Sequence, residues 1–270
     1  MRIGNREFDL DSKCYVMGIL NVTPDSFSDG GRFQEVDRAL FQVERMLEEG
    51  MDILDIGGES TRPGHTKICD EEEIGRVVPV IKKVKREFDI PISLDTYKSV
   101  VAEAGISAGA DMINDIWGLK YDAEMAAVIS RAGVPCCLMH NRSEAVYEEL
   151  VTDVISDLQE SLSLAEKAGI AGEKIILDPG IGFGKTYEQN LEMVAKLERL
   201  YVLGYPLLLG CSRKSVIGLT LDLPASERLE GTLATTVIGV LKGCAFVRVH
   251  DVKENARAVR MAEAVKRYMV

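Results

Sequence analysis

The sequence lacks the features that mark membrane-spanning, secreted or disordered proteins. No uncharged apolar run approaches the roughly 20 residues of a membrane-spanning helix, and residues 1–7 do not form the apolar part of a signal peptide. Its 46% hydrophobic and 28% charged residues are typical of a globular protein. We therefore expect a cytoplasmic protein that does not bind membranes.

Cysteine is also sparse and is not arranged for metal binding. The sequence has six cysteines and no C-x-x-C pair, which argues against a zinc site. A chain of 270 residues can bury a large core and does not need disulfides for stability. We expect the cysteines to be reduced and to act as small buried hydrophobic residues.

Positive charge is in deficit. The chain has 32 lysines and arginines against 43 aspartates and glutamates, a formal net charge of −11. Such a surface repels polyanions, so nucleic acid and anionic lipid are excluded as expected partners. If the substrate is a small anion, the cations that bind it must be gathered in one place.

Short apolar runs alternate with longer segments of helical periodicity. The runs are mostly apolar and do not alternate with polar residues, as is typical of parallel strands covered on both faces. They occupy residues 16–20, 53–56, 90–94, 112–114, 134–139, 174–177, 206–209 and 245–249. Residues 2–14, which precede them, indicate a small hairpin.

Eight strand–helix units in one chain predict an α/β fold: a single (β/α)8 TIM barrel over residues 1–270, with the small N-terminal hairpin. A doubly wound sheet is the alternative, but residues 18–23 carry no G-x-G-x-x-G fingerprint. Pro79 lies inside one helical stripe, where we expect a kink or a break.

Polar residues gather where the predicted strands end, the place where such barrels carry their chemistry. A common pocket explains why all eight strand ends carry polar groups better than eight separate helix caps do. The residues are Asn21, Asp55, Asp95, Asn114, Asp115, His140, Asp178, Ser212, Arg213, Lys214, Arg248, His250 and Asp251.

Three glycine-rich segments follow strands. Residues 21–31 and 57–64 have the composition of mobile loops that close over a polar ligand. Residues 180–186 resemble a phosphate-binding loop, but only three residues separate Gly180 from Gly184, where that motif requires four. A nucleotide kinase is therefore not indicated.

Five sequence blocks together resemble dihydropteroate synthase. They lie at residues 17–31, 55–64, 178–186, 212–215 and 248–252, in the order of that family, and the resemblance covers the whole chain. It implies condensation of 6-hydroxymethyl-7,8-dihydropterin diphosphate with para-aminobenzoate, assisted by Mg²⁺. It also implies a homodimer formed through helices late in the chain.

The residues suit a pterin, whose amino-pyrimidone edge presents neighbouring N–H donors. A buried carboxylate can accept two hydrogen bonds from that edge, and Asp178 is our candidate. The resemblance adds Asn114 and Asp95 to the polar floor and Met139 to the pocket wall. Lys214 is expected to donate to the ring acceptors.

A diphosphate leaving group needs cations that stabilise its developing charge. Arg248 and His250 lie two apart on a predicted strand, so both side chains can face one anion. Arg62 is expected to close the site from its loop. These three residues and Lys214 are the predicted catalytic residues, and Asn21 is expected to offer an oxygen to Mg²⁺.

A flat ring with a carboxylate calls for aromatic and hydroxyl groups. We predict that Phe27, Phe183 and Pro63 enclose para-aminobenzoate, that Thr61 binds its amine and that Ser212 meets its carboxylate. His65, His140 and Arg213 receive no role.

Two alternatives remain open. A methyltetrahydrofolate–corrinoid methyltransferase shares the barrel and the pterin floor, but it does not need a diphosphate clamp. A pterin-binding protein without catalysis should show decay in the loops.

Overall fold

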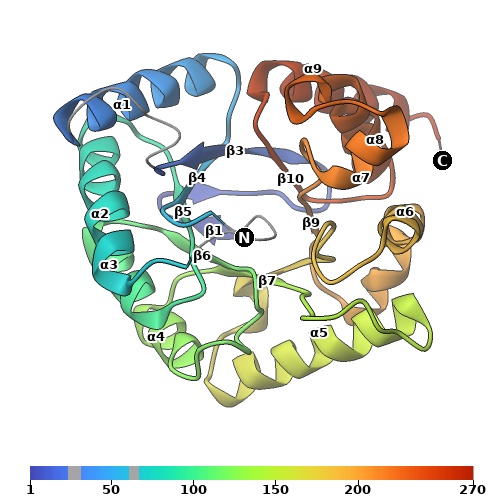
Figure 1. The fold of residues 1–270 in the computed structure, drawn as a ribbon, viewed down its shortest axis with the longest axis horizontal. Helices are drawn as coiled ribbons and strands as arrows, with labels where there is room; N and C mark the ends of the chain where they lie inside the picture. The colour runs from blue at the N-terminus through green and yellow to red at the C-terminus, as the bar shows by residue number, and fades with distance from the viewer. Residues whose placement is uncertain (24–31, 61–66, 270) are drawn as a thin grey trace.

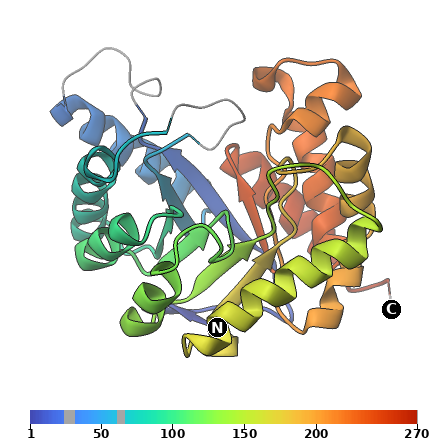
Figure 2. The same ribbon diagram turned by 60° about the horizontal axis from the view of Figure 1, so that its bottom comes forward.

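Eight parallel strands form a ring at the centre of the protein, with helices around it (Figures 1 and 2). The structure is a computed structural model that describes residues 1–23, 32–60 and 67–269. The strands are β3 (Tyr15–Asn21), β4 (Ile53–Gly57), β5 (Ile92–Asp95), β6 (Met112–Asp115), β7 (Cys136–Met139), β8 (Ile175–Asp178), β9 (Leu208–Leu209) and β10 (Phe246–Val249). All eight predicted strands are present, although β9 has only two residues.

The sheet order is β8-β7-β6-β5-β4-β3-β10-β9. An isolated parallel bridge between Leu177 and Leu207 brings β8 next to β9 and completes the ring. The fold is therefore the predicted barrel and not a doubly wound sheet. The predicted hairpin is also present, as β1 (Arg2–Ile3) paired antiparallel with β2 (Arg6–Glu7).

Helices cover the outside of the ring. They are α1 (Arg32–Glu48), α2 (Asp70–Glu87), α3 (Ser99–Ala108), α4 (Met125–Ala132), α5 (Leu150–Lys167), α6 (Tyr187–Ala195), α7 (Ser215–Leu221), α8 (Leu229–Leu241) and α9 (Val252–Lys266). Short 3-10 helices lie at Gly172–Lys174, Leu197–Leu203 and Ala225–Glu227. None of the helices in the described residues is both long and apolar enough to cross a membrane.

The core has two layers because successive side chains of a strand point to opposite faces. One layer lies between strands and helices, and the other fills the barrel. Ile3 and Phe8 of the N-terminal segment pack into the inner layer, against residues such as Met17, Ile53 and Phe246. The hairpin thereby closes the end of the barrel from which the strands start.

Two expectations about single residues need correction. Pro79 was expected to kink or break its helix, and the break is wrong, because α2 continues from Asp70 to Glu87. Val77 and Ile81 are fully buried on either side of it, so packing holds the helix together across one missing hydrogen bond. Cys69 is exposed, whereas the other five cysteines are buried as expected and all six are free.

Leu94 shows how the outer layer is packed. Its side chain is fully buried, and a Cβ added to Gly105 of α3 would overlap it, so Leu94 fills the space that this glycine leaves. We expect Leu94→Ala to lower the free energy of unfolding by about 3 kcal/mol, because it removes buried methyl groups and leaves a cavity. Chemical denaturation measures this loss. The half-exposed Val100→Ala in α3 is the control, and equal losses would contradict the packing argument.

Candidate active site

The polar residues predicted at the strand ends do gather at one end of the barrel. Asp55, Asp95, Asn114 and Asp178 lie on β4, β5, β6 and β8, and all four are buried. Arg248 lies on β10 and Asn21 is the last residue of β3. A barrel with its other end closed offers this end as the place for a ligand.

Arg248 spans the mouth of the barrel between two buried carboxylates. Its Nε donates to Asp55 Oδ2 at 2.6 Å, and its Nη2 donates to Asp95 Oδ2 at 2.7 Å. The two carboxylates in turn hold the pKa of Arg248 above its usual range, in spite of burial. The guanidinium is therefore permanently charged and fixed in place.

Each of these carboxylates keeps an oxygen for a further partner. Asp55 Oδ1 and Asp95 Oδ1 are buried and make no hydrogen bond within the part of the chain that the structure describes. Burial raises the pKa of Asp95 to about 7; Arg248 counteracts this rise and Asp55 adds to it. A buried acceptor without a partner is costly, so Asp95 Oδ1 is suited to accept from a ligand donor.

Asp178 and Lys214 are two further charged groups of the mouth that influence each other electrostatically. Asp178 Oδ1 accepts from the Gly180 amide at 2.7 Å. Burial raises the pKa of Asp178 and lowers that of Lys214, while the attraction between the two groups opposes both shifts. The ammonium of Lys214 donates to the carbonyl of Ile181 and lies 4.6 Å from the centre of the Phe183 ring.

A small apolar cluster borders these charges. Met139 packs with Tyr97 and Ile116, and the partly buried Trp117 and Phe183 lie against them. Met139 thus lies beside the predicted pterin residues. Phe183 is neither a core residue nor fully exposed, since it joins this cluster and faces Lys214.

Ser212 and His250 are joined on the β9–β10 side of the mouth. The Ser212 Oγ lies 3.0 Å from His250 Nδ1 and accepts from the His250 amide at 3.1 Å. Arg213, to which the sequence assigned no role, forms an ion pair with Asp251, with its Nε 2.9 Å from Asp251 Oδ2. Arg213 is therefore paired on the protein itself.

Four predicted site residues, Phe27, Thr61, Arg62 and Pro63, lie outside the described residues, as does His65. The structure does show how the ends of the second loop are held. Lys98 Nζ donates to Glu59 Oε2 at 2.6 Å and to the Ile68 carbonyl at 2.8 Å, and Glu73 accepts from it at 2.8 Å. One buried ammonium thus ties together residues on both sides of 61–66.

Sequence reasoning missed two parts of this site. Asp55 was noted at a strand end but was given no role, although it is the nearest partner of Arg248. The group formed by Glu59, Glu73 and Lys98 was not predicted either. A lysine just after a strand end was its only local signal, and nothing in the sequence connects it to two glutamates.

The described residues contain no group of three or more histidine, cysteine, aspartate or glutamate side chains arranged to hold a metal ion. Oxygen atoms are nevertheless present at the end of β3. A Cβ built on Gly57 would lie 3.7 Å from both Asn21 Oδ1 and Asp95 Oδ2. Mg²⁺ often binds proteins through one or two oxygens while keeping water and phosphate ligands, and this sparse donor set suits that mode.

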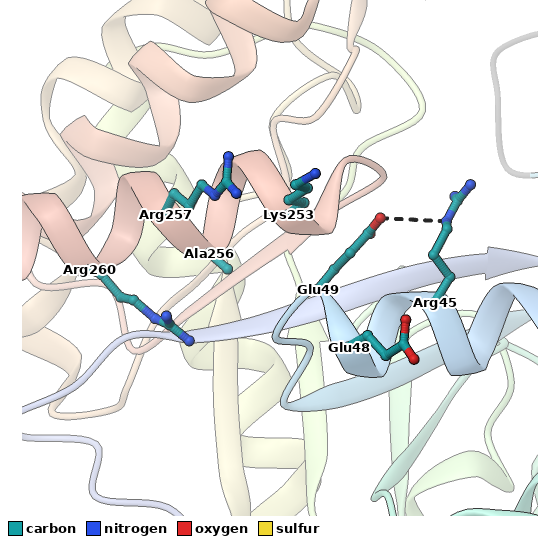
Figure 3. Close-up of a pocket in the computed structure, with 7 residues that line it drawn as sticks. All are labelled: Arg45, Glu48, Glu49, Lys253, Ala256, Arg257 and Arg260. Carbon is teal, nitrogen blue, oxygen red and sulfur yellow. Dashed lines mark ion pairs between the residues drawn. The ribbon is translucent and has the colours of Figure 1, made fainter.

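A hollow of about 420 Å³ lies on the outside, between α1 and α9 (Figure 3). Arg45, Lys253, Arg257 and Arg260 line it together with Glu48 and Glu49. Arg45 Nε lies 3.5 Å from Glu49 Oε1, and Arg260 points away from Lys253 and Arg257. These cations do not converge on one point, so the strand ends remain the candidate site.

Known proteins share this fold and sequence. Residues 17–250 match the pterin binding enzyme family. The dihydropteroate synthase of Clostridium beijerinckii is 59% identical over 268 residues, which cover 99% of this chain and 100% of that protein.

Solved structures agree. The dihydropteroate synthase of Clostridium difficile, determined in the presence of pteroic acid, has a TM-score of 0.94 and 51% identity and covers 96% of this chain and 99% of its own. The Xanthomonas albilineans enzyme with 4-aminobenzoic acid has a TM-score of 0.90 and 43% identity, and the match covers 95% of this chain and 94% of that enzyme's chain.

The barrel with its charged mouth therefore belongs to the pterin-binding enzymes. Within that family the chain is a dihydropteroate synthase. It transfers the pterin-methyl group of 6-hydroxymethyl-7,8-dihydropterin diphosphate to para-aminobenzoate, giving dihydropteroate and pyrophosphate. The corrinoid methyltransferase and the non-catalytic pterin carrier, left open by the sequence, are not supported by these relatives.

Proposed function

We propose that the pterin binds at the floor of the mouth, with its donor edge on Asp178. Asp178 is buried, and its Oδ1 is already oriented by the Gly180 amide, which supports this assignment. Asp95 and Asn114 are also buried at the ends of β5 and β6, and Met139, paired with Asp178 in the sheet, provides apolar contact. Lys214 donates to the ring acceptors. The buried carboxylates around one fixed arginine are the observation that carries the proposal.

Arg248, His250 and Arg62 bind the diphosphate in this proposal. The bond between the pterin methylene carbon and the diphosphate oxygen breaks, and its electron pair leaves with pyrophosphate. The amine nitrogen of para-aminobenzoate forms the new bond and then loses a proton. Fixed cations at the leaving oxygen lower the barrier because they need no reorganisation as charge develops.

Para-aminobenzoate is proposed to lie nearer to solvent than the pterin. Phe183 offers a ring that Lys214 already contacts, and the Ser212 hydroxyl is held by His250. Phe27, Thr61 and Pro63 complete the proposed site from the two loops. The Xanthomonas albilineans enzyme was solved with 4-aminobenzoic acid, which supports this class of substrate.

Asn21 is the proposed protein ligand of Mg²⁺, through its amide oxygen near Gly57. The ion supplies charge neutralisation for the diphosphate when bound. Asn21 orients it from the end of β3, and Asp95 faces the same space. The small number of protein oxygens here suits a cation that takes most of its ligands from substrate and water.

A turnover assay tests these assignments together. Purified protein with the pterin diphosphate, para-aminobenzoate and Mg²⁺ is expected to release pyrophosphate and form dihydropteroate. Removal of Mg²⁺ with EDTA should abolish turnover, and Asn21→Ala should raise the Mg²⁺ concentration needed for half-maximal rate by about tenfold. An unchanged Mg²⁺ requirement in that variant would remove Asn21 from the metal site.

The pKa of Asp95 predicts opposite pH trends for activity and stability. Asp95 must be ionised to pair with Arg248 and to accept from the pterin, so kcat/KM for the pterin diphosphate should fall below about pH 7. Because this pKa lies above the unfolded value of about 4, this group's contribution to stability should be largest below pH 4 and decline up to pH 7. Asp95→Asn should remove both trends; persistence of the acidic limb would assign it to another group.

We propose a homodimer in the cytoplasm. Large hydrophobic residues on three late helices are exposed, which supports a dimer face there: Leu219 of α7, Ile238 of α8 and Met261 and Val265 of α9. Sedimentation equilibrium of the wild type and of Met261→Glu measures this association.

A further inference from the structure

A polar group of one buried and three half-buried residues lies between the loops that follow β7 and β8. It contains His140 and Arg142 from the first loop, Lys185 from the second and Asp157 from α5. His140 is fully buried, although sequence reasoning treated it as a loop residue without a role. None of these four residues is assigned to substrate binding above.

Hydrogen bonds join the four residues in series. Arg142 Nε donates to Asp157 Oδ2 at 2.5 Å, His140 Nε2 lies 2.9 Å from the same oxygen, and Lys185 Nζ lies 2.8 Å from His140 Nδ1. The Asp157 carboxylate can only accept, so Nε2 carries the proton of the neutral ring and donates it to Asp157, and Nδ1 accepts from Lys185. Burial lowers the pKa of His140 to about 3, consistent with a neutral ring.

Lys185 uses its other two donors on the loop that holds the substrate groups. Its Nζ donates to the Gly180 carbonyl at 3.1 Å and to the Phe183 carbonyl at 3.2 Å. The Gly180 amide in turn orients Asp178 Oδ1. With His140, these carbonyls match all three donors of the ammonium, so Lys185 has none left for a phosphate.

The two loops are packed backbone against backbone. A Cβ added to Gly180 would overlap the His140 carbonyl, and one added to Gly184 would overlap the backbone of Arg142. Both glycines have positive φ, +69° and +52°. The position of the second loop therefore depends on the first loop. Two side chains of the first loop also bind the second: His140 through Lys185, and Tyr147, whose hydroxyl donates to the Gly184 carbonyl at 2.6 Å.

We propose that Lys185, oriented by His140, is a positioning residue for the synthase reaction: it sets the Asp178 carboxylate and the Phe183 ring in the geometry that binds both substrates. The proposal rests on the substrate assignments made above for Asp178 and Phe183. Lys185 itself contacts neither substrate and acts only through the backbone of residues 180–183.

Lys185→Met tests this inference, because methionine keeps most of the side-chain volume and removes all three donors. We expect KM for each substrate to rise at least about tenfold, with kcat at saturation reduced less than about threefold. Lys174→Met is the matched control, since Lys174 Nζ also donates to a carbonyl, that of Gly133, at the other end of β8. Unchanged KM values in Lys185→Met would overturn the proposal.

Two substitutions of His140 separate positioning from simple packing. Asparagine places its amide oxygen where Nδ1 lies and keeps the acceptor for Lys185, whereas glutamine places its amide nitrogen where Nε2 lies and loses that acceptor. We expect the KM values of His140→Asn to stay within about threefold of the wild type, and those of His140→Gln to rise as in Lys185→Met. The double variant of His140→Gln and Lys185→Met should show no further rise in KM. Equal effects of Asn and Gln would overturn the role of His140.

Hydrogen exchange measures the order of the loop without turnover. It can be measured on His140→Gln, so the proposal remains testable if Lys185→Met does not fold. In His140→Gln, the amides of residues 180–186 should exchange faster while those of β3 to β6 do not change. Unchanged exchange in 180–186 would overturn the proposal. Binding assays distinguish failure of the substrate assignment from failure of the positioning role. If Asp178→Asn leaves pterin affinity unchanged, the substrate assignment of Asp178 is wrong. If Asp178→Asn loses pterin affinity but Lys185→Met does not, only the positioning role is contradicted.

Discussion

Arg248→Met is expected to lower kcat/KM for the pterin diphosphate by about three orders of magnitude. The variant removes a fixed cation from the leaving diphosphate, and loss of one such group typically costs 10²- to 10³-fold. It also leaves Asp55 and Asp95 buried without their common partner, which raises their mutual repulsion. Affinity for a pterin without the diphosphate should fall far less. Steady-state kinetics measures kcat/KM, and isothermal titration calorimetry measures the affinity for the pterin without the diphosphate.

Two further variants make the Arg248 prediction decisive. Arg248→Lys keeps a charge but cannot span both carboxylates, so it should fold and retain an intermediate rate. Arg131→Met is the control, because the Arg131–Glu103 pair lies exposed on α4 and α3 at 3.6 Å. Equal losses of affinity for the bare pterin and for the diphosphate would show that Arg248 belongs to the pterin floor alone.

Asp178→Asn is expected to weaken binding of the pterin itself by about 100-fold. The amide oxygen can still accept from Gly180, but its NH2 group then faces the N–H donors of the pterin edge, where an acceptor is required. Loss of the carboxylate charge also removes the attraction that favours the ammonium form of Lys214. Titration with a pterin that lacks the diphosphate measures the effect without catalysis.

The matched control for Asp178 is Asp122→Asn. Asp122 also accepts from backbone amides, those of Ser99 and Glu124, but it belongs to the segment before α4 and is not a strand-end residue. We expect its pterin affinity to equal that of the wild type. An Asp178→Asn variant with wild-type affinity for the pterin would place the donor edge elsewhere.

The sequence predicted the barrel well because its signals are local. The run at 16–20, for example, is apolar throughout, and the structure places the polar residue that follows it, Asn21, at the mouth. Where local signals compete, prediction was weaker: the run at 206–209 yields only the two residues of β9, and Pro79 does not break α2. There, tertiary packing and strand pairing decide the outcome.

The partners within the site could not be predicted in the same way. Arg248 is 193 residues from Asp55 and 153 from Asp95, and no periodicity connects them. His140 and Lys185 were each visible, one as a histidine after a strand and the other at the end of a failed phosphate motif. Their contact depends on Gly180 and Gly184, which let the loops touch, and this approach is visible only in the three-dimensional structure.

The single bridge between Leu177 and Leu207 makes the β8–β9 boundary the seam of the ring. Asp178 lies directly after one side of this seam, and Lys214 follows the other, beyond β9. If the pterin binds to both residues, as proposed above, it bridges the least hydrogen-bonded joint of the barrel. Substrate binding and closure of the ring are then thermodynamically linked, so the barrel resists opening at the β8–β9 boundary most strongly when substrate is bound.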